Sequence, residues 1–314
     1  MNTKILITGA GGQVGTELSL ALGHKYSNDA IIVSDIKELK TNFKSYLLDI
    51  TDANRLQEIV SKENITQIYH LAAVLSAKAE SIPLKAWYIN MTGLLNVLEV
   101  AKVNKLEKVF YPSSIAVFGD STPKICTPQH TINEPTTVYG ISKYTGELWA
   151  QYYHQKYGLD VRGLRYPGII SYKTTPGGGT TDYAVDIFIH AIQGIQYTCY
   201  LDSNTVLPMM YMPDVIQATL QLMNVNATSI TVRTAYNING MTFTPAELHH
   251  SICKIKPNFE IHYQPDYRQK IAASWNHSLD DTKAKHDWGW TPHYDIDMMC
   301  TDMLAKLENS YLLK

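Results

Sequence analysis

Residues 4–15, KILITGAGGQVG, pass from a short apolar run into a turn with glycines at positions 9, 12 and 15. Glycines permit a tight turn, let the backbone approach a pyrophosphate and allow close helix packing, while the N-terminus of the following helix offers N–H groups to the anion. The segment therefore predicts a strand, a phosphate-binding turn and a helix. Gln13 and Val14, which stand between the second and third of these glycines, belong to the same predicted site.

An acidic residue follows the glycines at a distance that favours a dinucleotide. Asp35 lies twenty residues beyond Gly15, at the end of the apolar run AIIVSD. A carboxylate there would bind the ribose hydroxyls and repel a 2′-phosphate, so NAD is favoured over NADP. Asp49, which ends a third apolar run, is placed to reach the adenine edge, and its alternative role is to cap the helix that follows.

Short apolar runs alternate with amphipathic stretches along the first half of the chain. This alternation indicates repeated strand–helix–strand units, and so an α/β fold whose doubly wound parallel sheet is of the Rossmann type. The predicted strands lie within residues 4–9, 30–35, 45–50, 67–73, 108–114 and 161–167, and the predicted helices within 14–22, 54–63, 93–102 and the segment after Tyr139.

The alternation breaks near residue 167, where turn residues begin to cluster. A smaller C-terminal substrate lobe is expected there. Residues 211–238 read as a further helix and strand of the first lobe. The sequence thus predicts an NAD-binding domain of residues 1–166 to which 211–238 return, and a substrate-binding lobe of 167–210 and 239–314.

Composition describes a globular chain with a small-molecule partner. The 314 residues are 45% hydrophobic and 18% charged, with a formal net charge of −2, which gives no electrostatic footprint for nucleic acid or for an anionic membrane. The four cysteines lie far apart with no CxxC pair, so we expect reduced thiols and no metal site. The chain runs from Met1 straight into an apolar segment, and a cytoplasmic protein is expected unless a presequence has been removed.

A second chemical signal is YGISK at residues 139–143, preceded by Ser113 and Ser114 at the end of a predicted strand. Residues four apart share one face of a helix, so Lys143 and Tyr139 can meet the same ligand. A free tyrosine has a pKa near 10, and an adjacent ammonium group favours the phenolate, which would make Tyr139 usable as a base.

With the glycine turn, the acid, the serine pair and YxxxK in this order, the chain resembles the extended short-chain dehydrogenase/reductase superfamily. The resemblance implies that Ser114, rather than Ser113, forms a catalytic trio with Tyr139 and Lys143. It also implies a homodimer formed through helices near 92–103 and 142–157. Further cofactor contacts implied by the resemblance are Asp49 and Ile50 at the adenine, Leu71, Ala72 and Ala73 along the dinucleotide, and Asn90, Tyr166, Pro167 and Ile169 around the nicotinamide.

Within that superfamily, the sequence departs from the nucleotide-sugar enzymes. Met209 and Met210 stand where an arginine and an acid are expected, so a substrate diphosphate would lack charge-assisted partners. The segments HLAAVLSAKAE, AWYINMTGLLNVLE, PGGGTTDYAVDIF, IAASWNHSLDD and DWGWTPHYDIDMM instead closely resemble the short-chain type of L-threonine 3-dehydrogenase. This resemblance implies oxidation of the C3 hydroxyl of L-threonine to 2-amino-3-oxobutanoate, with NAD as the only cofactor.

The loop at residues 176–186, PGGGTTDYAVD, is the predicted substrate loop. Thr180 and Thr181, with N–H groups of the glycine run that includes Gly178, could bind the substrate carboxylate. Ser76 is a candidate polar contact whose alternative role is a loop cap, and Trp275 is a candidate apolar wall whose alternative role is a core aromatic.

Two alternative functions stay open at this point. A nucleotide-sugar 4-epimerase or dehydratase would hold NAD tightly and bind a UDP- or dTDP-sugar. A non-catalytic dinucleotide-sensing protein would not need an intact serine, tyrosine and lysine set.

Overall fold

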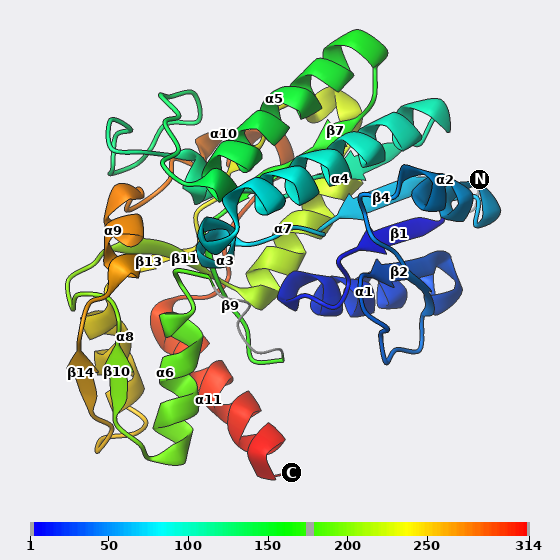
Figure 1. Ribbon diagram of the computed structural model, residues 1–314. Helices are drawn as coiled ribbons and strands as arrows, with labels where there is room; N and C mark the ends of the chain where they lie inside the picture. Colours follow the sequence, from blue (N-terminus) through cyan, green and yellow to red (C-terminus); the bar gives the residue numbers. More distant parts are fainter. Residues whose placement is uncertain (1–2, 174–178, 313–314) are drawn as a thin grey trace.

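The structure is a computed structural model that describes residues 3–173 and 179–312. Its centre is a parallel sheet whose strand order is the one typical of dinucleotide-binding folds, which confirms the predicted Rossmann-type class (Figure 1). Across the sheet the strands are β3 (Lys44–Leu47), β2 (Ile31–Asp35), β1 (Ile5–Thr8), β4 (Gln67–His70), β5 (Lys108–Phe110) and β7 (Val161–Arg162).

Each face of this sheet has its own apolar core because successive side chains of a strand point to opposite faces. Leu6 of β1 packs toward α2 (Ala53–Lys62), α4 (Pro83–Val103) and α5 (Val138–Tyr157). Its neighbours Ile5 and Ile7 pack toward α1 (Gln13–Tyr26) and α7 (Met212–Asn224). The strands therefore read as continuous apolar runs rather than as alternating ones.

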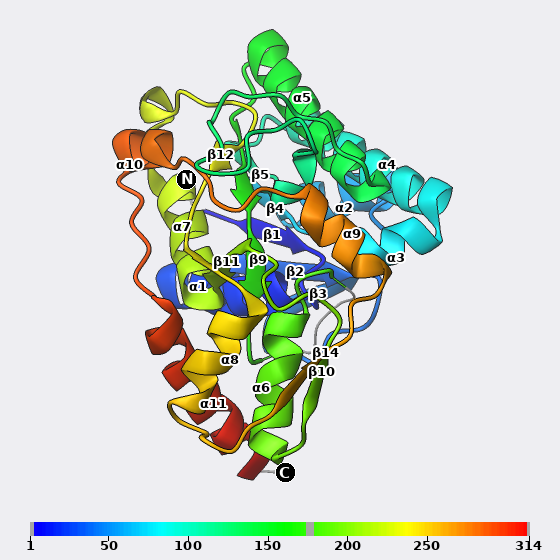
Figure 2. The same cartoon turned by 90° about the vertical axis from the view of Figure 1, so that its left-hand side faces the viewer.

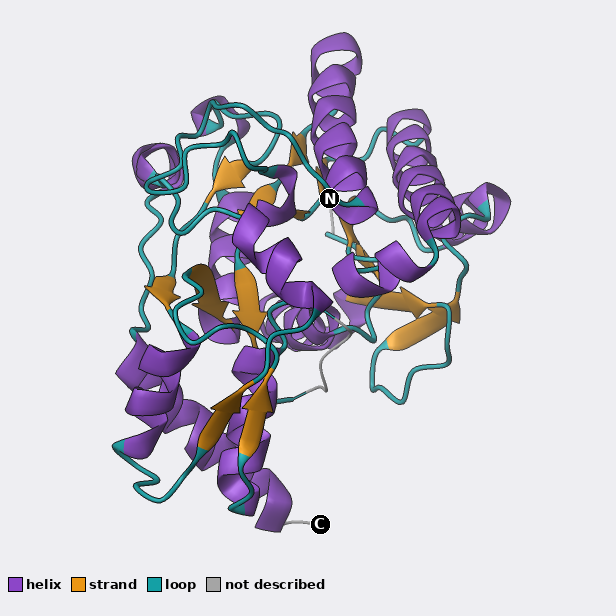
Figure 3. Ribbon diagram, turned by 60° about the vertical axis from the view of Figure 1, so that its left-hand side comes forward, coloured by secondary structure: helices purple, strands orange, loops and turns teal. Residues whose placement is uncertain are grey.

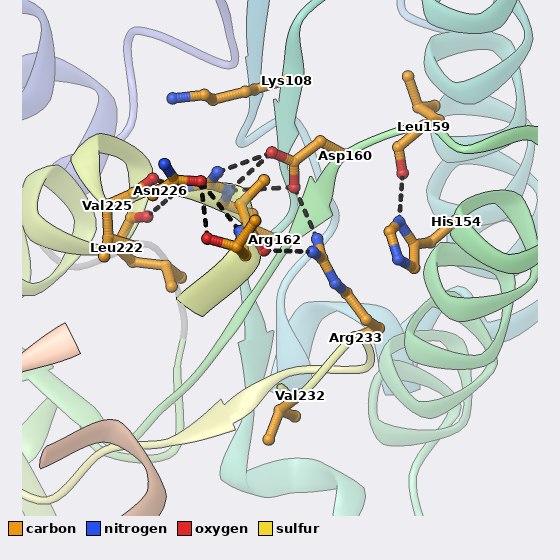
Figure 4. Close-up of polar contacts among 12 residues, drawn as sticks. Lys108, His154, Leu159, Asp160, Arg162, Leu222, Val225, Asn226, Val232 and Arg233 are labelled. Carbon is orange, nitrogen blue, oxygen red and sulfur yellow. Dashed lines mark hydrogen bonds and ion pairs between the residues drawn. The ribbon is translucent and has the colours of Figure 1, made fainter. Parts of the chain in front are cut away.

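The helix that follows residue 211 packs against the first half of the chain. α7 lies beside α1, and β12 (Tyr236–Asn237) pairs in parallel with β8 (Leu164–Tyr166). Arg162 fixes the end of α7, since its Nη1 donates to the carbonyl oxygens of Leu222 at 2.6 Å and Val225 at 2.8 Å (Figure 4). Asp160 pairs with both Arg162 and Arg233 at 2.7 Å, which joins the last sheet strand to the returning segment.

A second group of elements encloses a separate core on the other side of the molecule (Figure 2). Its strand pair is parallel and lies beside its helices (Figure 3). These elements are α6 (Tyr183–Gln193), β10 (Tyr197–Cys199), α8 (Pro245–Cys253), β14 (Ile261–Tyr263), α9 (Tyr267–Ser274) and α11 (Ile296–Leu312).

A three-stranded sheet lies between the two groups. β11 (Leu207–Tyr211) is its central strand, with β9 (Gly168–Ile170) parallel on one side and β13 (Met241–Phe243) antiparallel on the other. Met209 of β11 packs in the second core, whereas its neighbour Met210 packs in the core of the first sheet. The smaller remaining elements are α3 (Ser76–Ser81), β6 (Ser113–Ser114), α10 (Thr282–Trp288) and the 3-10 turns Asn28–Ala30, Ile115–Val117 and Ala227–Ser229.

Candidate active site

The turn between β1 and α1, and the first turn of α1 itself, each require a glycine. Gly9 has φ +69°, and a Cβ there would lie 2.6 Å from the backbone nitrogen of Ala72. A Cβ at Gly15 would lie 2.6 Å from the Cα of Ala10. Gly12 is the N-cap of α1 and makes no side-chain cap hydrogen bond, so the positive end of the helix dipole meets the turn without a capping side chain.

Polar groups around this turn fit a dinucleotide. Asp35 Oδ2 accepts the backbone N–H of Gly11 at 3.0 Å, which places the carboxylate at the mouth of the glycine turn. The side-chain nitrogen of Gln13 is buried and has no hydrogen-bond partner among the described residues. A buried amide without a partner is costly, and a bound pyrophosphate or ribose would supply an acceptor.

The adenine candidates divide into a surface residue and a core residue. Asp49 is exposed, and its Oδ1 accepts from the backbone and the hydroxyl of Thr51 at 2.9 and 2.8 Å. The alternative role of Asp49 as the cap of the next helix is wrong, because Asp52 caps α2 by accepting the N–H of Arg55 at 2.9 Å. Ile50 is buried in the core between sheet and helices.

The catalytic candidates come together at the start of α5. Thr137 caps this helix by accepting the N–H of Gly140, and so sets where the first turn begins. Tyr139 is hydrogen-bonded to the side chain of Ser114. Lys143 Nζ lies 5.6 Å from the centroid of the Tyr139 ring and donates to the carbonyl oxygen of Pro112 at 2.7 Å.

The expected lowering of the Tyr139 pKa by Lys143 is wrong for this structure. Burial raises the pKa of Tyr139 to about 12, and the hydrogen bond to Ser114 opposes that rise. Burial also lowers the pKa of Lys143 to about 7, against the pull of the Glu147 carboxylate. The reason is that desolvation penalises the charged forms of both the phenol and the amine.

Asn90 of α4 holds the segment that follows β4. Asn90 Oδ1 accepts the N–H of Val74 at 2.8 Å, and its Nδ2 donates to Val74 O at 3.1 Å and to Ser142 Oγ at 3.2 Å. These contacts fix the segment that contains Leu71, Ala72 and Ala73 beside the glycine turn. His70, which sequence reasoning did not single out, is buried beside this segment, and its Nδ1 lies 2.9 Å from Thr8 Oγ1.

Tyr166, Pro167 and Ile169 lie on β8, just after it and on β9. Tyr166 pairs in register with Ser114, so its backbone lies beside the trio. Its ring is buried, and its hydroxyl is hydrogen-bonded to Thr219 of α7. Pro167 follows at the strand end, and Ile169 of β9 is half-buried against the core of the first sheet.

The substrate candidates are only partly brought together. Thr180 is buried, and its hydroxyl has no hydrogen-bond partner among the described residues, which leaves it available for a ligand. Thr181 lies near β9, because a Cβ added to Gly168 would come within 2.8 Å of its methyl group. Ser76 begins α3 and is buried, and Trp275 packs in the second core. Gly178 lies outside the described residues.

One expected anion ligand is already engaged. The N–H of Gly179 donates to Asp182 Oδ2 at 2.7 Å, so this amide of the glycine run is not available for a substrate carboxylate. Asp182 follows the two threonines, and the turn from residue 179 to 182 satisfies its own backbone.

The fold and these residues define the class of protein. The family model of the NAD dependent epimerase/dehydratase family matches residues 5–238, and the chain belongs to this family. NAD is its cofactor, as the glycine turn and Asp35 predict. An uncharacterised epimerase/dehydratase of Staphylococcus aureus is 43% identical over 99% of this chain and 98% of its own length.

Solved structures give a more particular likeness. The holo form of a GalE-like L-threonine dehydrogenase from Cupriavidus necator is 53% identical, with a TM-score of 0.96 over 97% of this chain and 99% of that one. A monomeric L-threonine 3-dehydrogenase from a metagenome, in its apo form, is 46% identical, with a TM-score of 0.95 over 98% and 99% of the two chains. The chain is thus similar throughout to L-threonine dehydrogenases.

The described part of the chain lacks two further features. None of the helices there is both long and apolar enough to cross a membrane. Residues 3–173 and 179–312 contain no group of three or more His, Cys, Asp or Glu side chains arranged to hold a metal ion.

Proposed function

We propose that the protein oxidises the C3 hydroxyl of L-threonine to 2-amino-3-oxobutanoate with NAD as hydride acceptor. The observation that carries this proposal is the meeting of Ser114, Tyr139 and Lys143 in a chain that also has a dinucleotide-binding turn and is similar over its whole length to L-threonine dehydrogenases. Oxidation of a secondary alcohol needs a proton acceptor next to a hydride acceptor, and this combination supports such an arrangement.

Each member of the trio has a distinct role in this reaction. Tyr139, as the phenolate, takes the proton from the C3 hydroxyl, and Ser114 hydrogen-bonds the same oxygen. Lys143 holds the cofactor ribose, and it lies on the same face of α5 as Tyr139. When bound, NAD supplies the hydride acceptor and, in its nicotinamide ring, a positive charge. That charge favours the phenolate, which burial alone disfavours in Tyr139.

The two threonines at the start of α6 are proposed to bind the amino-acid part of the substrate. The buried hydroxyl of Thr180 without a partner supports this role, and Thr181 stands next to it beside β9. Gly178 belongs to the same proposed loop. We also propose Ser76 as a polar contact and Trp275 as an apolar wall on the side of the substrate methyl group.

A nucleotide-sugar substrate receives no support from β11. Met209 and Met210 are both fully buried, and they bring no charge to the strand where a diphosphate would need a cation. A thermal shift with a UDP- or dTDP-sugar tests this alternative directly. A dinucleotide sensor without catalysis is tested by Tyr139→Phe, which would leave such a sensor unchanged.

We propose a cytoplasmic homodimer that forms through α4 and α5. Leu148 and Tyr152 of α5 and Val103 of α4 are exposed although they are large and apolar, which is typical of a covered surface. Leu148→Glu should convert the dimer to a monomer in light scattering. Ile255→Glu, at an exposed apolar position in the second group of elements, is the matched control and should leave the mass unchanged. A wild-type monomer, the state of the metagenome relative, would refute the dimer.

The catalytic proposal is tested by NADH formation across a panel of amino acids and alcohols. L-threonine should give NADH and D-threonine very little, because Ser114 and Tyr139 must reach one particular hydroxyl. A protein that is silent toward L-threonine at saturating NAD would refute the proposal.

A further inference from the structure

Three consecutive residues next to the catalytic site each contact α5. Pro112 O accepts from Lys143 Nζ at 2.7 Å, Ser113 Oγ donates to Glu147 Oε1 at 2.5 Å, and Ser114 is hydrogen-bonded to Tyr139. The three helix residues are spaced by four, so they form one row along the buried face of α5. The short strand β6, here called the serine strand, is therefore attached to the helix at Ser114 and at the two residues that precede it.

Glu147 is a carboxylate without contact with solvent. Its side chain has a relative exposure of 0%, and Arg165 at 3% meets it with two hydrogen bonds, from Nε at 2.9 Å and from Nη2 at 2.7 Å. A charge in such an environment is retained only when it is paired and fully hydrogen-bonded. Arg165 and Ser113 together satisfy both oxygens of Glu147.

Arg165 connects this carboxylate to two further segments. Its Nη1 donates to the carbonyl oxygen of Gln129 at 3.1 Å and to Asn237 Oδ1 at 3.0 Å. Arg165 is also the register partner of Ser113 on the neighbouring strand. Ser113, Glu147 and Arg165 thus form a closed ring of contacts. Ser113 pairs with Arg165 across adjacent strands, Ser113 hydrogen-bonds Glu147, and Glu147 forms an ion pair with Arg165. The hydrogen bond from Arg165 to Asn237 attaches this ring to β12.

The serine strand needs such an anchor because it is short. β6 consists of Ser113 and Ser114 alone and, in the described part of the chain, has a strand neighbour on one side only. Two residues of pairing do not fix a strand tightly. The contacts of Ser113 with Glu147 and of Ser114 with Tyr139 therefore add to what holds β6.

We propose that Glu147, held by Arg165, is a positioning residue that acts through Ser113 to place Ser114 against Tyr139. Neither Glu147 nor Ser113 touches the reacting atoms. This inference rests on the proposed dehydrogenase function, because the three residues of the ring would hold Ser114 and Tyr139 in position around the oxygen of the substrate. A displacement of about 1 Å at a reacting centre can cost roughly a hundredfold in rate.

Ser113→Ala is the sharpest test because it removes one hydroxyl and leaves the ion pair in place. The kcat for L-threonine should fall by about tenfold or more, while the KM for NAD stays within about twofold. The fall should disappear in a Ser114→Ala background, since Ser113 acts only through Ser114. Glu147→Gln, in folded protein, should likewise lower kcat in the wild-type background and have no further effect in the Ser114→Ala background.

A matched control separates positioning from general stability. Asp160→Asn removes the acid of another inward-facing ion pair, which lies with Arg162 at the end of α7 (Figure 4). It should lower the melting temperature as Ser113→Ala does, or by more, and leave kcat unchanged.

Three results would overturn the positioning role. These are an unchanged kcat in Ser113→Ala, an equal fall in the wild-type and Ser114→Ala backgrounds, and a fall in kcat that Asp160→Asn reproduces. If the wild-type enzyme is silent toward L-threonine, the proposed substrate falls instead. The same variants are then compared on whichever secondary alcohol of the panel reduces NAD, so the two failures remain distinct.

Discussion

Lys143 donates a hydrogen bond of 2.7 Å to the carbonyl oxygen of Pro112, one residue before the serine strand. This contact turns the amine toward the chain segment that carries Ser113 and Ser114. Lys143 therefore joins the base on α5 to the serine strand before any ligand arrives. A cofactor ribose that binds Lys143 would meet an amine whose position is already set, which reduces the ordering that binding must supply.

Tyr139→Phe should lower kcat strongly while leaving cofactor binding intact. General base catalysis contributes about a hundredfold to ten-thousandfold, and a loss of kcat in that range is expected. The measurement is NADH formation from L-threonine together with NAD affinity. Tyr144→Phe, one residue beyond Lys143 on the same helix, is the control and should keep its activity. Equal activity of Tyr139→Phe and wild type would exclude Tyr139 as the base.

Gly9→Ala should destroy NAD binding, and Gly158→Ala supplies a matched control. Both glycines have a similar positive φ, +69° and +70°, but a Cβ at Gly158 meets nothing within 4 Å, whereas one at Gly9 meets the backbone of Ala72 at 2.6 Å. The φ cost alone is about 1 kcal/mol of unfolding free energy. Calorimetric NAD titration should show binding in Gly158→Ala and none in Gly9→Ala. Binding by both variants would contradict the close packing of this turn.

Asp35→Asn should weaken the selection of NAD over NADP. The carboxylate stands at the glycine turn, where it repels a 2′-phosphate, and the amide removes that charge with little change in shape. The ratio of kcat/KM values for the two cofactors should shift toward NADP by about tenfold or more. Asp52→Asn, which keeps a capping oxygen at the start of α2, is the control and should leave this ratio unchanged. A ratio unaltered in Asp35→Asn would remove Asp35 from the cofactor site.

His70 should make the protein sensitive to mild acid. Burial lowers the pKa of His70 from 6.5 to about 3, and the charge of Lys143 adds to this lowering. The folded state then binds fewer protons than the unfolded state between these values, so the free energy of unfolding falls as the pH drops below 6.5. From pH 7.5 to 5 the loss from this group is about 2 kcal/mol.

His70→Gln removes the titrating group and tests this sign. Denaturant unfolding at both pH values should show a smaller loss in the variant than in the wild type. An equal loss in the two proteins would show that other groups cause the acid sensitivity.

The sequence predicted the first sheet well because its signals are local. Each predicted apolar run overlaps a strand, and residues 9, 12 and 15 lie in the turn and at the start of α1, because glycine spacing encodes backbone geometry directly. Helical spacing also predicted that Tyr139 and Lys143 lie close together, whereas the choice of Ser114 as their partner came from the family resemblance.

What the sequence did not reveal depends on burial and on distant partners. Glu147 follows Lys143 by four residues, which was a usable signal, but its partner Arg165 becomes visible only when β8 pairs with β6. The raised pKa of Tyr139 reflects desolvation, which a motif does not report. Asp52 rather than Asp49 caps α2, because the helix begins at Ala53 and the N-cap is the residue directly before it.

Hydride transfer from C3 of L-threonine is tested most directly with substrate carrying deuterium at C3. The deuterium should appear on the nicotinamide ring of the reduced cofactor in mass spectrometry, and no label should appear when Tyr139 is replaced by phenylalanine. Reduced cofactor without deuterium, or no reduction of NAD by L-threonine at all, would contradict the proposed reaction.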